Sequence, residues 1–172
     1  AALAAADYRL SVDAATQSAE QDPLDWWSAT VTAVRQVLKQ IDATSLLALS
    51  VGGQGPTVVA IDSALRPAGP ALTWLDRRAG QELETLSRRV NRPLPSHAYL
   101  PRVMWLKKHQ PQTYETAHWF GQAWDFVAAQ FSGEPAVSTS PGIAPWTDEL
   151  LSASDLDGAK FPSLRSMGTQ LG

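Results

Sequence analysis

Three short apolar runs that follow one another closely constrain the fold of this chain more than any other feature. They cover residues 46–51, 57–61 and 71–75, and the first run ends in Gly52 and Gly53. A continuous apolar run of this length is typical of a strand buried on both faces. The connections after Gly52 are too short for the crossover of roughly a dozen residues that parallel neighbours need. The sequence therefore predicts three strands in a mixed sheet.

Helices are expected beside these strands, and the clearest covers residues 23–40. Asp22 can cap its first turn, Pro23 fits the first helical position, and Asp25 suits the electropositive helix start. Apolar residues then recur at spacings of three and four, which predicts one buried stripe. The stripe consists of Trp27, Val31, Val34, Leu38 and Ile41.

The remaining segments complete an α/β pattern. Further helices are expected over residues 77–90, from Pro101 to before Pro111, over 122–132 with Gly133 as its stop, and over 148–152. Alternating apolar residues predict an edge strand over residues 1–10, and residues 137–146 are expected to form an irregular hairpin. The fold class is therefore α/β, a mixed β-sheet flanked by helices.

Composition excludes several classes of function. Fourteen Lys and Arg against seventeen Asp and Glu leave a net charge of −3, which argues against a nucleic-acid partner because phosphate contacts need a basic face. The chain has no cysteine, so disulfides and thiolate nucleophiles are excluded. No apolar stretch approaches the roughly eighteen residues of a membrane span. We therefore expect no membrane contact and a cytoplasmic location, and the histidines suggest no metal site.

Five segments carry a recognisable series of motifs. They are E-Q-D-P with W-W over residues 20–27, S-V-G-G-Q to D over 50–62, R-P to W-L-D-R-R over 66–78, R-V-M-W-L over 102–106, and W-D-F to S-G-E over 124–134. In this order they resemble the N-terminal domain of the FGGY carbohydrate kinases, the family of xylulokinase, glycerol kinase and gluconate kinase. The resemblance implies a ribonuclease H-like domain of the actin and hexokinase type.

The family resemblance also implies parts that this sequence does not show. Family members begin with a D-x-G-T-x-S hairpin that approaches the nucleotide phosphates, and a later G-G-x-D stretch holds the catalytic aspartate. Neither motif occurs here. We therefore expect residues 1–172 to form a single sugar-binding domain, incomplete at its N-terminus and lacking the phosphate-loop hairpin and the C-terminal nucleotide domain. The resemblance implies ATP and Mg²⁺ for the parent enzyme, no cofactor bound by this fragment, and a fragment inactive alone.

The resemblance implies two alternative functions. The first is the sugar-binding domain of an ATP-dependent carbohydrate kinase that phosphorylates a primary hydroxyl of a pentulose or polyol. Its partners would be a small sugar or polyol and the missing C-terminal kinase domain. The alternative is a non-catalytic domain that binds a sugar or a protein. An exposed sheet edge would invite pairing, so a homodimer is among the expected assemblies.

A sugar site needs hydrogen-bonding groups beside an aromatic face, and residues 52–74 offer both. Gln54 sits at a strand end, where it either contacts a sugar or caps a tight turn. Gly55 and Thr57 stand where family members contact substrate, although Gly55-Pro56-Thr57 replaces the Met-His-Gly of xylulokinases. Trp74 matches a pocket tryptophan of the family and could equally be a core aromatic.

Three further residues complete the candidate site. Asp76 follows Trp74, and its alternative role is the N-cap of the helix expected from residue 77. His97 lies before the Arg102 helix, where the resemblance implies a substrate-facing side chain and the alternative is an exposed bystander. Asp125 matches the family's K-D-Y aspartate, and its alternative role is to stabilise a helix N-terminus. We expect all seven residues to be substrate-binding, with no catalytic residue among them.

Overall fold

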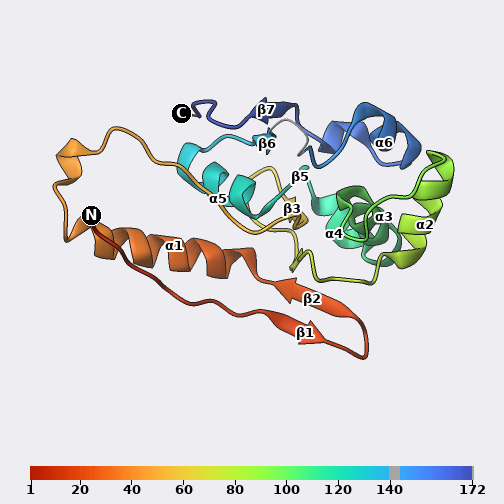
Figure 1. Ribbon diagram of the computed structural model, residues 1–172, viewed down its shortest axis with the longest axis horizontal. Coiled ribbons are helices and arrows are strands. Elements are labelled where there is room, and N and C mark those ends of the chain that lie inside the picture. Colours follow the sequence, from red (N-terminus) through yellow and green to blue (C-terminus); the bar gives the residue numbers. More distant parts are fainter. Residues whose placement is uncertain (140–143, 172) are drawn as a thin grey trace.

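The computed structural model describes residues 1–139 and 144–171 (Figure 1). An antiparallel hairpin of β1 (Ser11–Asp13) and β2 (Ser18–Gln21) leads into the long helix α1 (Pro23–Leu38). The central elements are η1 (Ala43–Ser45), β3 (Val59–Ile61), β4 (Ala71–Leu72), α2 (Gly80–Arg89), α3 (Tyr99–His109) and α4 (Pro111–Thr116). The remaining ones are β5 (Trp119–Gly121), α5 (Ala123–Ser132), β6 (Val137–Thr139), α6 (Asp148–Ala153), η2 (Gly158–Lys160) and β7 (Leu164–Ser166).

The described strands form three small sheets. The first has the order β1-β2-β4 with antiparallel pairing, and Glu20 of β2 lies opposite Leu72 of β4. In the second, β3 pairs antiparallel with β5, so that Ala60 faces Phe120. In the third, β6 and β7 are parallel. A bridge between Val58 and Leu72 joins the first two sheets. Both pairing directions therefore occur in the domain, but within each described sheet all pairs run in the same sense, so the predicted single mixed sheet is not found.

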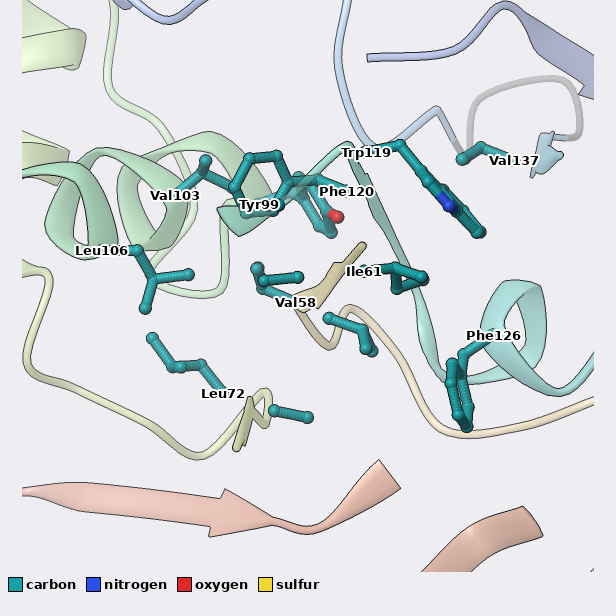
Figure 2. Close-up of a cluster of buried hydrophobic side chains, with 14 of the residues drawn as sticks. Val58, Ile61, Leu72, Tyr99, Val103, Leu106, Trp119, Phe120, Phe126 and Val137 are labelled. Atoms are coloured by element: carbon teal, nitrogen blue, oxygen red, sulfur yellow. The ribbon is translucent and has the colours of Figure 1, made fainter. Parts of the chain in front are cut away.

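The core lies between these sheets and the helices, as Figure 2 shows. Val58, Ile61 and Leu72 enter it from the strand regions, and Phe120 and Phe126 enter it from β5 and α5. Helix α3 supplies further side chains, namely Tyr99, Val103 and Leu106. Burying a side chain of this size stabilises a fold by roughly 1.5–3 kcal/mol. This core fixes where β3, β4 and α3 meet, and Thr57, Trp74 and His97 lie shortly before or after these three elements in the chain.

The predicted helices are confirmed, with local cap chemistry that explains their limits. The Asp22 carboxylate accepts a hydrogen bond from Leu24 N at 2.9 Å and starts α1. Helix α5 ends at Gly133, whose φ of 75° lies in the left-handed region that glycine tolerates. Thr147 caps α6 by accepting from Leu150 N. The strands predicted over residues 57–61 and 71–75 are present in shorter form as β3 and β4.

Two predicted strands are wrong. Residues 1–10 and 46–51 have no regular secondary structure, and the first strand begins only at Ser11. Leu46, Leu47 and Leu49 are 53%, 98% and 57% exposed instead of buried on both faces. The physical reason is pairing: among the described residues, neither segment has a neighbouring strand in a sheet. An apolar run alone does not form a strand, because backbone hydrogen bonds need a partner.

Several element boundaries and pairings also differ from the prediction. Helix α2 starts at Gly80 instead of residue 77, and α4 and β5 were not predicted. Helix α1 buries Trp26, whereas Leu38 of the predicted stripe is 37% exposed. The prediction of a hairpin over residues 137–146 is wrong for the described residues. Strand β6 pairs with β7 and not with the residues that follow it directly. Residues 140–143 of that expected hairpin lie outside the described residues.

Candidate functional site

Gln54 lies in the turn that leads from residues 46–51 into β3. Its side chain is partly buried, and its amide Nε2 donates a hydrogen bond to Oε1 of Gln21 at the end of β2. Gln21 in turn donates through Nε2 to the carbonyl oxygen of Arg9 at 3.2 Å. The Gln54 amide thereby contacts the end of β2 and keeps its carbonyl oxygen and one N–H for other partners.

Gly55 lies directly under the indole of Trp124. A Cβ atom built on Gly55 would be 2.5 Å from two carbons of that ring, which is closer than any real contact, so only glycine fits here. Thr57, two residues on, is entirely buried, and its Oγ1 has no hydrogen-bond partner among the described residues. The turn is therefore tightly packed, and Thr57 does not face solvent.

Trp74 follows β4 at the surface and keeps 42% of its area exposed. It is not the core aromatic that the alternative interpretation offered. An exposed indole beside polar loops can cover the apolar face of a sugar ring.

Asp76 is fully buried and already holds several donors. Its carboxylate accepts from Ala19 N of β2 at 3.0 Å and from Arg78 N at 3.1 Å. The Arg78 guanidinium also donates to it, with Nη2 at 2.6 Å, and bonds Glu20 at 2.5 Å while lying over the Trp105 ring. This cluster ties β2 to the segment after β4. The alternative role of Asp76 as a helix N-cap is wrong, because α2 begins at Gly80 after Ala79.

Arg102, near the start of α3, is the residue that sequence reasoning missed. Its guanidinium is buried, and Nη1 donates to the carbonyl oxygens of Pro56 at 3.0 Å and Thr73 at 2.7 Å. Nη2 donates to the carbonyl oxygen of His97 at 2.7 Å, whereas the His97 side chain is exposed. Burial lowers the pKa of Arg102 to about 10, so it stays protonated at neutral pH. The available signal was an arginine inside the apolar R-V-M-W-L run.

Asp125 lies on the first turn of α5 and links that helix to β6. Its Oδ2 accepts from Gln122 N at 2.9 Å in a capping box, which agrees with the helix-stabilising alternative. Its Oδ1 accepts from Ser138 N and from Ser138 Oγ, both at 3.0 Å. Burial raises the pKa of the Asp125 carboxyl to about 6 despite these donors.

An apolar groove of about 410 Å³ lies beside Gln54. Residues 4–6, α1, residues 49–54 and α5 line it, and Trp124 forms part of its wall. Trp74, Asp76 and His97 are not among its lining residues. The candidate residues therefore form separate groups. Gln54 borders the groove, whereas the segments that carry Gly55, Thr57, Trp74 and His97 meet at Arg102.

Within residues 1–139 and 144–171, no group of three histidine, aspartate or glutamate side chains lies where it could hold a metal ion. In the same part of the chain, none of the helices is long and apolar enough to cross a membrane. What the arrangement offers is hydrogen-bonding side chains and an exposed indole, which are the means of recognising a polyhydroxylated molecule.

Comparison with known proteins places this arrangement in a family. The xylulose kinase of Escherichia coli is 28% identical over 162 residues, which cover 84% of this chain and 33% of that protein. The chain thus spans about a third of the length of the curated relatives it matches.

Solved structures agree on the fold. A crystal structure described as a xyloylose kinase from Brucella ovis has a TM-score of 0.78 at 18% identity, covering 94% of this chain and 37% of that one. A gluconate kinase from Lactobacillus acidophilus has a TM-score of 0.77 at 17% identity, covering 93% and 36%. The expected actin-type α/β fold is therefore confirmed. Residues 2–172 match the FGGY family of carbohydrate kinases, N-terminal domain, and the chain belongs to that family.

Proposed function

We propose that this chain provides the sugar-binding surface of an ATP-dependent carbohydrate kinase that acts on a primary hydroxyl of a pentulose or polyol. The observation that carries the proposal is the convergence on Arg102 of three loops that hold polar and aromatic candidate residues. The relatives support a ketopentose as the first substrate to test, because the sequence relative in Escherichia coli is a xylulose kinase. A cytoplasmic location stays a prediction.

Within this proposal the candidate residues take different parts. Gln54 meets a sugar hydroxyl through its carbonyl oxygen or through the second N–H of its amide, since Gln21 accepts from the amide nitrogen only once. Trp74 covers the apolar side of the sugar with its exposed indole, which requires the sugar to reach from Gln54 beyond the groove that Trp74 does not line. Gly55 and His97 lie in the loops that Arg102 connects. Thr57, Asp76 and Asp125 are buried, so contact between these side chains and a sugar would require the surrounding segments to open.

The test is the thermal stability of the chain in the presence of D-xylulose, D-ribulose, xylitol, glycerol and gluconate, each at millimolar concentration. A ligand at a hundred times its dissociation constant stabilises the native state by about 2.7 kcal/mol. For a chain of this size we expect the midpoint to rise by roughly 5–10 °C. The Trp74→Ala and Gln54→Ala variants should lose this rise, whereas Trp27→Ala, in helix α1, should keep it.

Two results would contradict the proposal. One is the absence of a shift with every sugar and polyol in the panel. The other concerns the phosphate transfer: we expect the chain alone to release no ADP from ATP and Mg²⁺ in a coupled assay with D-xylulose. Turnover at the rate of a whole kinase would show that our assignment of the catalytic parts to other segments is wrong.

A second candidate function, a non-catalytic domain that binds a protein or a second copy of itself, is favoured by the exposed apolar side chains of Leu46, Leu47 and Leu49. Sedimentation equilibrium from micromolar to millimolar concentration tests self-association. A monomer throughout, together with a sugar-induced thermal shift, favours the kinase proposal over this one.

A further inference from the structure

Arg102 connects segments that are otherwise distant in the sequence. Its three acceptors, the carbonyl oxygens of Pro56, Thr73 and His97, lie 46, 29 and 5 positions away along the chain. Pro56 is flanked by Gly55 and Thr57, and Thr73 directly precedes Trp74. All three acceptors therefore belong to loops that carry candidate sugar-binding residues.

The geometry of the guanidinium makes this connection rigid. A single atom, Nη1, donates to both Pro56 and Thr73, so the turn before β3 and the segment after β4 converge on one nitrogen. Nη2 holds the loop before α3 from the same planar group. A planar fork of donors fixes its acceptors relative to one another more firmly than a flexible single ammonium group would.

The hydrogen bonds of the Arg102 guanidinium go to these backbone carbonyls and to no carboxylate of the described residues. No carboxylate of residues 1–139 or 144–171 forms an ion pair with it. Its Nε–H is buried and has no acceptor among the same residues. Burying an unpaired N–H is unfavourable, so the position does not optimise the solvation of the guanidinium itself. Its charge is directed instead at three neutral backbone dipoles.

We infer that Arg102 is a positioning residue, which holds the Gly55–Thr57 turn, the Trp74 segment and the His97 loop at the mutual distances that sugar binding requires. This inference rests on the proposed function. Arg102 acts through the backbone of the loops and does not itself contact the sugar. Without it, the three carbonyls lose their shared donor, and the turn at Pro56 and the segment at Thr73 are held together only by the neighbouring bridge between Val58 and Leu72.

The experiment compares Arg102→Met, Arg102→Lys and a matched control, Arg89→Met. Arg89 also donates to a backbone carbonyl, that of Ala153 at 2.8 Å, but lies away from the candidate residues. Hydrogen–deuterium exchange of the ligand-free chain reports the order of each loop. Titration with D-xylulose, followed by thermal shift and calorimetry, reports the affinity.

In Arg102→Met we expect faster exchange confined to residues 52–57, 73–76 and 96–98, and D-xylulose affinity reduced by about tenfold or more. Arg102→Lys keeps the charge and three donors but replaces the planar fork with a single ammonium group. It should therefore recover only part of the lost affinity, and exchange in the three loops should stay faster than in the original chain. Arg89→Met should change neither measurement. If Arg102→Met does not fold, Arg102→Gln replaces it, with an intermediate loss expected because its amide keeps two donors.

Three outcomes would overturn the inference. They are exchange that rises uniformly along the chain, exchange that stays unchanged in the three loops, and affinity that stays unchanged in Arg102→Met (or in Arg102→Gln, where that replaces it). Failure of the proposed function is distinguishable from these. If the original chain binds none of the sugars while Arg102→Met still loosens only the three loops, sugar binding is refuted and the loop-holding role of Arg102 is supported.

Discussion

Replacing Asp76 by asparagine separates a structural role of this carboxylate from a role in sugar binding. The change keeps the size of the side chain and removes its charge. The Asp76 side chain has no exposed area, and Ala19 N and three groups of Arg78 donate to it. In asparagine, one of the two acceptor oxygens becomes an NH₂ group that faces these donors.

The magnitude follows from two opposing effects. Removing one partner of a buried ion pair costs about 3–5 kcal/mol, because the other charge is left uncompensated. Here the Arg78 side chain is 14% exposed and keeps its bond to Glu20 at 2.5 Å, which softens the loss. We therefore expect the free energy of unfolding to fall by about 3 kcal/mol, at the lower end of that range. The thermal midpoint should fall by roughly 6–12 °C.

Urea unfolding at pH 7, followed by circular dichroism, measures this loss directly. The matched control is Glu149→Gln, which breaks the exposed pair between Glu149 and Arg92 and should produce no resolvable change. A loss under about 1 kcal/mol for Asp76→Asn would refute the argument from burial and charge pairing. If such a variant also lost its response to D-xylulose, Asp76 would belong to the sugar site and not to the framework.

Three further predictions address neighbouring positions. Thr57→Val should raise stability by about 1 kcal/mol in urea unfolding, because it removes a buried hydroxyl without a partner among the described residues; a loss would mean that Oγ1 is satisfied. Gly55→Ala should cost about 1–3 kcal/mol by the same measurement, because its Cβ would meet Trp124, whereas Gly52→Ala, with nothing within 4 Å, should be neutral. Burial raises the pKa of Asp125 from its ordinary 3.8 to about 6, so the unfolded chain ionises first as the pH rises. The stability of the original chain relative to Asp125→Asn should therefore fall by about 3 kcal/mol between pH 4 and pH 6 and stay level above that; a difference independent of pH would contradict this assignment.

The sequence predicted those parts of the fold that depend on local chemistry. Asp22 followed by Pro23 located the start of α1, and Gly133 located the end of α5, because caps are local interactions. Residues 46–51 show the limit of this reasoning. Their apolarity predicted a buried strand, but a strand also needs a pairing partner, and hydrophobicity carries no information about where that partner lies.

The candidate site shows the same division. Motif order pointed to the loops around Gln54 and Trp74, because each motif is a contiguous segment. Arg102 could not be predicted in this way, since its three acceptors are main-chain carbonyls, which any residue type would supply. The sequence also does not predict that Asp76 and Asp125 are buried. A carboxylate near a helix start looks the same in sequence whether it faces solvent or lies in the interior.

The exposed segment around Leu47, which has no regular secondary structure, has a consequence for proteolysis of the chain. A protease that prefers leucine finds an internal target there, since exposed chain without secondary structure is where nicking concentrates. Cleavage would leave a short piece containing β1, β2, α1 and η1 and a longer piece containing β3 and all later elements. The two pieces stay joined through the pairing of Glu20 with Leu72 and through the bond from Ala19 N to Asp76. A nicked sample should therefore elute as one particle and come apart only in denaturant, which makes this position a natural place to divide the protein into two complementing fragments.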